Sequence, residues 1–148
     1  MKKSSQLTNL LQELFASQKL AVLATYGDGR PYINLVAFAA TDDLKHLLFT
    51  TNRNTRKYRN LKENPQVAVL VDNRANRTSD FHKATAVTAI GKAKESMGSA
   101  RKRLGKTYLA KHPQLEEFAG SLENALFSVK IDDYVIATFK KVITLKPD

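Results

Sequence analysis

Short apolar runs with the pattern of β-strands follow one another along nearly the whole chain, and turn residues separate most of them. They occupy residues 20–25, 32–40, 46–51, 67–72, 84–94, 125–131 and 134–145. Gly27 and Gly29 mark a hairpin after the first run, and Asp132-Asp133 marks a turn between the last two. Strands that arrive in hairpin order favour an antiparallel sheet or barrel over a fold of alternating strands and helices.

Three segments have helical character instead. Leu7, Leu10, Leu11, Leu14 and Phe15 recur at helical spacing and predict an amphipathic helix that packs on the main body. A second helix is expected over residues 55–63, stopped by Asn64-Pro65, and a basic one over residues 99–111. The length of 148 residues fits a single domain, 1–148, with its own core.

The net charge of the chain bears on the kind of partner that it binds. There are 24 Lys and Arg residues against 14 Asp and Glu residues, a formal net charge of +10. Such a surplus favours anionic partners such as phosphates, nucleotides, nucleic acid or acidic lipid surfaces. The alternative is that the charge serves solubility alone. The absence of cysteine excludes disulfides and thiolate metal sites. No apolar run approaches the ~18 residues of a membrane span, and the N-terminus lacks the apolar core of a signal peptide, so we expect a cytoplasmic protein without membrane contact.

The junction between the third strand and the second helix concentrates groups that bind anions. Thr55 is placed to cap the helix, which puts Arg56 and Lys57 in the first turn. The helix dipole disfavours positive charge there, unless an anion sits at the helix start. Thr50, Thr51 and Thr55 would supply hydroxyls to a phosphate monoester, and Arg56 and Lys57 the charge. The alternative is a solvated basic helix that tolerates its charges.

The same junction resembles a known family. The residues that carry the resemblance are Phe49-Thr50-Thr51-Asn52, Thr55-Arg56-Lys57, Leu61 and Asn64-Pro65, with Leu23-Ala24-Thr25, Gly29-Arg30-Pro31, Ile90-Gly91-Lys92-Ala93 and residues 108–118 in the same order along the chain. This arrangement is similar to the pyridoxamine 5′-phosphate oxidase-like flavin-binding split barrels. The resemblance implies a mainly β fold, a six- to seven-stranded antiparallel split β-barrel with flanking helices.

The resemblance also implies a homodimer with two FMN molecules at the subunit interface. By position, Arg56 and Lys57 would hold the FMN phosphate with Thr50, Thr51 and Thr55. The strand segment Asn34, Leu35 and Val36 would lie along the isoalloxazine ring, largely through backbone groups, and Phe139 would approach the flavin from the partner chain. The expected function is that of an FMN-dependent oxidoreductase acting on an unidentified small molecule.

Departures from the family pattern narrow that function. Residues 34–40 contain neither the Arg nor the Lys that pyridoxamine phosphate oxidases proper carry there, Ala86 stands near an expected glutamine, and the arginine-rich C-terminal motif is absent. Oxidation of vitamin B6 is therefore not expected. No catalytic side chain is assigned, since a flavin carries the redox chemistry itself. A cofactor-binding protein without turnover, acting as a flavin store or sensor, stays open.

Other ligands stay open as well. A basic β-barrel that binds nucleic acid is a rival, although such barrels present exposed aromatic side chains, and here most Phe and Tyr fall in core-like patterns. A deazaflavin or haem would suit the same architecture, and His82 is the histidine to watch for haem. His46 and His112 are predicted at the surface, and no metal site is expected. The basic cluster Arg101 to Lys106 is interpreted first as a solvated face.

Overall fold

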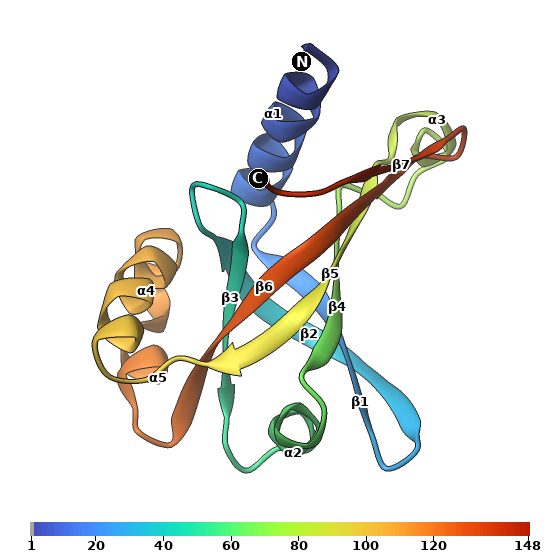
Figure 1. Ribbon diagram of the computed structural model, residues 1–148. Helices are drawn as coiled ribbons and strands as arrows, with labels where there is room; N and C mark the ends of the chain where they lie inside the picture. Colours follow the sequence, from blue (N-terminus) through green and yellow to red (C-terminus); the bar gives the residue numbers. More distant parts are fainter. Residues whose placement is uncertain (1) are drawn as a thin grey trace.

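One seven-stranded antiparallel sheet organises the chain in the computed structural model, which describes residues 2–148 (Figure 1). The strands are β1 (Leu20–Gly27), β2 (Arg30–Ala40), β3 (His46–Asn52), β4 (Gln66–Asp72), β5 (Ala86–Glu95), β6 (Asn124–Ala137) and β7 (Val142–Leu145). Their order is β3-β2-β1-β4-β5-β6-β7, and an additional pairing of β3 with β6 closes six strands into a barrel. The predicted fold class is confirmed.

Helices flank the barrel on different sides. They are α1 (Lys2–Ser17), α2 (Arg56–Glu63), α3 (Asp80–Lys83), α4 (Gly98–Lys111) and α5 (Glu116–Gly120), with a 3-10 turn at Pro113–Leu115. Figure 1 shows α1 at one end of the barrel, α2 at the opposite end and α4 alongside. No helix within residues 2–148 combines the length and apolar character needed to cross a membrane.

The side chains of the strands alternate between two cores. One face of β3 sends Leu47 and Phe49 into the barrel interior, where Phe49 stacks on Phe127 with ring centroids 5.5 Å apart. The other face sends Leu48 outward to Leu104 and Tyr108 of α4. Burying a Leu or Phe side chain of this kind contributes about 1.5–3 kcal/mol. The barrel interior and the contact with α4 therefore both hold β3, which leads into α2.

Strands β2 and β3 pair over only three residues each, from Phe38 opposite Phe49 to Ala40 opposite Leu47. Beyond this point the strands part, and the barrel is split. A buried hydroxyl bridge lies where they part: the Tyr108 hydroxyl donates to the Ala37 carbonyl and accepts from Thr50 Oγ1, both at 3.1 Å. The first half of β2 therefore keeps one backbone edge without a partner strand in the described chain.

The turn predicted at Asp132-Asp133 is wrong, because β6 runs through it. Ile90 pairs with Asp133 and Gly91 with Ile131, so Asp132 is the extra residue of a β-bulge. Glycine is required opposite the bulge, since a Cβ on Gly91 would lie 2.1 Å from the Lys130 carbonyl oxygen. The chain turns instead after β6, where the Thr138 N–H donates to the Lys141 carbonyl at 2.9 Å. An acidic pair is typical of a turn, but a β-bulge whose side chains reach solvent accommodates an acidic pair equally well.

Candidate anion and cofactor site

The start of α2 has the local structure that the sequence predicts. Thr55 is the N-cap, with φ −128° and ψ 157°, and its Oγ1 accepts from the Tyr58 N–H at 3.2 Å. The same hydroxyl donates its proton to the Asn52 carbonyl at 2.8 Å. Among residues 2–148, no acceptor faces the backbone N–H groups of Arg56 and Lys57, as expected at the first turn of a helix. The helix start therefore presents two free donors.

The first turn of α2 also carries uncompensated positive charge. It contains no acidic residue, and within the described chain neither Arg56 nor Lys57 forms an ion pair with a carboxylate. Lys57 is half-buried, and this burial lowers its pKa from the ordinary lysine value. The Arg56 guanidinium lies over the Tyr32 ring, 4.6 Å from its centroid, which leaves the in-plane N–H groups free to donate.

Thr50 and Thr51 do not act together, contrary to the expectation that both face the phosphate. As neighbours in a strand they point to opposite faces of the sheet. Thr51 Oγ1 lies 3.3 Å from Thr55 Oγ1, whereas Thr50 is buried against Tyr108 on the side of α4. We call Thr51, Thr55, Arg56 and Lys57 the anion site. Thr50 belongs to the hydroxyl bridge instead.

The predicted β2 segment lies beside the anion site, because Tyr32 contacts Arg56. Asn34 follows Tyr32 on the same face of the strand, and its Oδ1 is buried with no hydrogen-bond donor within the described residues. Leu35 faces outward and is 62% exposed, whereas Val36 is 5% exposed in the core. Val36 can therefore offer a ligand only backbone groups.

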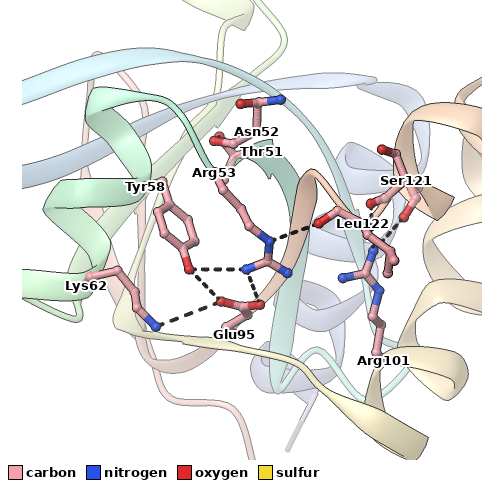
Figure 2. Close-up of polar contacts among 10 residues, drawn as sticks. Thr51, Asn52, Arg53, Tyr58, Lys62, Glu95, Arg101, Ser121 and Leu122 are labelled. Carbon is pink, nitrogen blue, oxygen red and sulfur yellow. Dashed lines mark hydrogen bonds and ion pairs between the residues drawn. The ribbon is translucent and has the colours of Figure 1, made fainter.

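The loop before α2 is fixed by a charged network that sequence analysis missed (Figure 2). Arg53 donates to Glu95 Oε2 at 2.6 Å, to the Tyr58 hydroxyl at 3.2 Å and to the Leu122 carbonyl at 3.1 Å. The Tyr58 hydroxyl in turn donates to Glu95 Oε1 at 3.1 Å. The ion pair with Glu95 raises the pKa of Arg53 above its ordinary value. Because Nε and Nη1 of Arg53 are engaged within the chain, Arg53 holds the loop, whereas the two cations of the anion site have no such contacts in the part of the chain that the structure describes.

The sequence alone does not distinguish the role of Arg53 from that of Arg56; their contacts in the folded chain do. Both are arginines of one basic stretch, and the carboxylate that pairs with Arg53 is 42 residues away in the sequence. Glu95 closes β5, and its side chain is 9% exposed. The Arg53 N–H also donates to the Glu123 carbonyl at 2.9 Å. The frame of the anion site thus depends on β5 and on the segment before β6.

Other residues singled out by sequence lie elsewhere. Arg101 donates to the carbonyls of Ala119 and Ser121, while Lys102, Arg103 and Lys106 are exposed along α4. The basic cluster is thus partly a contact with α5 and otherwise an exposed face. Helix α3 lies at the other end of the barrel from α2 (Figure 1), and Phe139 contacts Phe81 of α3. Within residues 2–148, no three His, Asp or Glu side chains are grouped to hold a metal ion.

The surface position predicted for His112 is wrong. The residue is 1% exposed, and its Nε2 lies 2.7 Å from the Phe38 carbonyl oxygen. A histidine before a proline indicates a helix end, but here that end packs onto β2, 74 residues earlier. His46 is half-buried, and His82 is exposed on α3.

Replacing Glu95 by glutamine tests the loop network. Glu95→Gln should lower the free energy of unfolding by about 1–3 kcal/mol, because it removes the charge that pairs with Arg53 in a largely buried place. Denaturant unfolding measures this. Asp133→Asn removes the carboxylate of the exposed pair with Lys146 and should have no measurable effect. Equal losses in the two variants would show that the network does not hold the loop.

Comparisons with known proteins agree with this architecture. The family model described as pyridoxamine 5′-phosphate oxidase matches residues 7–134. General Stress Protein 26 from Bacillus anthracis has a similar structure, with a TM-score of 0.73 and 18% identity over 95% of this chain and 98% of that one. An FAD-binding protein from Mesorhizobium loti has a TM-score of 0.67 and 17% identity over 86% of this chain and 90% of that one.

A haem-binding protein from Mycobacterium smegmatis shares the fold as well, with a TM-score of 0.83 and 13% identity over 95% of this chain. The chain spans 57% of the length of that protein. At such identities the likeness shows the fold alone. No curated protein matches the sequence. Because the family model covers most of the sequence and the barrel is split as in that family, the chain belongs to the pyridoxamine 5′-phosphate oxidase family.

Proposed function

We propose that this protein binds FMN and acts as a flavin-dependent oxidoreductase on a small molecule. One observation carries the proposal. Arg56 and half-buried Lys57 stand in the first turn of α2 without a carboxylate partner, beside two free backbone N–H groups. A phosphate monoester matches this donor set in charge and in number of acceptors. Thr55 would act mainly by holding the helix start, because its hydroxyl already caps α2.

The strand beside the anion site fits the rest of a flavin nucleotide. The unpaired edge of β2 offers backbone donors and acceptors for a planar ring, and the amide of Asn34 has an oxygen without a donor. Bound flavin would supply the redox chemistry, since it accepts and donates electrons or hydride itself. The residues of the chain would bind the phosphate, orient the ring along Asn34 to Val36 and keep water from one of its faces.

The choice of FMN rests on chemistry and on family membership together. The family is named for pyridoxamine 5′-phosphate, a substrate that bears a phosphate, and one protein of the same fold binds FAD. Haem is the second candidate, because another protein of the fold binds haem. Of the histidines here, His112 is engaged in the core and His82 is exposed, so His82 is the residue to test as a haem ligand. A deazaflavin phosphate would use the same anion site as FMN.

We also propose a homodimer formed through the outer face of β1, β2, β4 and β5. Cross-strand pairs place Leu35 beside Val22 and Ile33 beside Ala24 on this face, and β4 continues it with Leu70 and Ala68. Leu20, Ile33, Leu35 and Ile90 are 53%, 66%, 62% and 41% exposed. A contiguous exposed apolar face marks an interaction surface. A partner on this face would lie beside the backbone of residues 33–35, the strand segment proposed to carry the flavin ring.

Removing both cations of the anion site tests the FMN proposal. Arg56→Ala together with Lys57→Ala should weaken FMN binding at least tenfold, or about 1.4 kcal/mol, measured by quenching of flavin fluorescence. Arg59→Ala together with Lys102→Ala removes two exposed cations and should leave the affinity within about twofold. An unchanged affinity in the Arg56 and Lys57 variant would exclude the anion site.

The pH dependence of FMN binding tests the role of Lys57. Burial lowers its pKa in the free protein, and a bound phosphate would raise it again, so binding takes up a proton between the two values. Affinity should therefore fall as the pH rises through the lowered pKa of Lys57 toward the ordinary lysine value. Lys57→Arg keeps its charge over this range and should show a flatter profile. Identical profiles would show that Lys57 does not face the phosphate.

A charge on the outer sheet face tests the homodimer. Leu35→Asp should convert the protein to a monomer in sedimentation velocity, because it places a carboxylate on the apolar contact while leaving the folded protomer intact. Leu122→Asp changes a leucine that is 85% exposed after α5 and should leave the dimer unchanged. A monomeric wild-type protein, or a dimeric Leu35→Asp variant, would contradict the proposed interface.

A further inference from the structure

A pocket of about 830 Å³ lies between the loop after β4, α3 and the β6–β7 turn. These elements stand at the end of the barrel away from α2 (Figure 1). The lining of the pocket includes Leu70, Arg77, Thr78, Phe81 and Phe139. We call it the loop pocket. None of its lining residues belongs to the anion site.

Two phenylalanines give the loop pocket an exposed aromatic wall. Phe81 is 58% exposed and Phe139 is 68% exposed, yet their rings contact each other edge to face, with centroids 5.2 Å apart and planes at 68°. They come from α3 and from the β6–β7 turn. Large aromatic side chains that gather in a pocket without being buried provide a surface on which a planar ring stacks.

Positive charge borders the aromatic wall. Arg77 is exposed and forms no ion pair within the described chain. The nearby carboxylate of Asp80 accepts from the backbone N–H groups of Ala75, Asn76 and Arg77, and Asp72 pairs with Arg74 at 2.9 Å. Both acidic groups are thus engaged, and the Arg77 guanidinium remains available to a carboxylate.

The walls of the loop pocket are fixed without a ligand. Asp80 ties down residues 75–77 through the hydrogen bonds described above. At the opposite wall, Thr138 Oγ1 accepts from the N–H groups of Lys140 and Lys141, both at 3.2 Å. The base of the loop is closed by the Thr85 N–H, which donates to Asn73 Oδ1 at 2.8 Å. A pocket formed in advance loses little conformational entropy when it binds.

We propose that the loop pocket binds a small planar aromatic carboxylate, whose ring packs against Phe81 and Phe139, stacked on one ring and edge-on to the other, and whose carboxylate pairs with Arg77. The proposal does not rest on the anion site, none of whose residues lines the loop pocket. Two lining residues do have roles in the proposed dimer, since Leu70 lies on its outer sheet face and Phe139 is expected near the flavin of the partner chain, so the test below includes FMN binding and the monomer–dimer equilibrium. The proposal adds an organic acid to the ligands of this chain.

Titration of the full chain with 2-naphthoate tests the proposal, with 2-naphthalenemethanol as the uncharged comparison. Calorimetry should show one saturable naphthoate site per chain. Phe81→Ala and Phe139→Ala should each weaken naphthoate binding at least about threefold through lost stacking. Arg77→Gln should weaken naphthoate but not the uncharged analogue. Phe118→Ala and Arg59→Gln change an exposed phenylalanine and an exposed arginine elsewhere, and should bind naphthoate as the wild type does.

Several results would overturn the proposal. One is no saturable naphthoate binding at about millimolar concentration, the weak limit for a specific site; another is equal weakening in the two control variants. If Phe81→Ala and Phe139→Ala weaken FMN instead and leave naphthoate unaffected, the loop pocket serves the cofactor of a partner subunit. If they shift the monomer–dimer equilibrium and naphthoate does not bind, the loop pocket is an interface between copies.

Discussion

Positive charge stands at the start of α2, where the helix dipole opposes it by typically about 0.3–1 kcal/mol per residue. The chain fixes the frame around this charge in three ways: Thr55 caps the helix, Arg53 is tied to Glu95, and the buried Asn60 side chain donates to Thr25 Oγ1 at 3.1 Å. None of these contacts supplies a counter-ion to Arg56 or Lys57. A rigid frame with uncompensated cations is suited to an anion that comes from outside the chain.

The parting of β2 from β3 gives that anion site its surroundings. Had the two strands paired along their full length, the edge of β2 beside Arg56 would be occupied by β3. The short pairing leaves this edge free, and the hydroxyl bridge of Thr50, Tyr108 and Ala37 holds the strands where they separate. The proposed binding of the phosphate and of the flavin ring would thus depend on one topological feature, the closure of the barrel through β3 and β6 rather than through β2 and β3 alone.

Much of this was predictable from local sequence. Hairpin order predicted an antiparallel sheet or barrel, and the family resemblance predicted the split barrel. The Thr55 cap with its two following cations was placed correctly, because it depends on neighbouring residues. The opposite orientation of Thr50 and Thr51 also follows from strand alternation. The pairing of Arg53 with Glu95, the burial of His112 against Phe38 and the bulge at Asp132 depend on contacts between distant segments. No local pattern shows such contacts.

The visible absorption spectrum of the freshly purified protein, with mass spectrometry of what heat releases, tests the central claim most directly. A flavin spectrum and release of FMN are the predicted result, and a protein that purifies without cofactor should acquire the same spectrum when FMN is added. A haem spectrum would instead show that the protein binds haem, the second candidate cofactor. A colourless protein that also fails to bind added FMN would contradict the account, because the cations at the start of α2 would then have no flavin phosphate to hold.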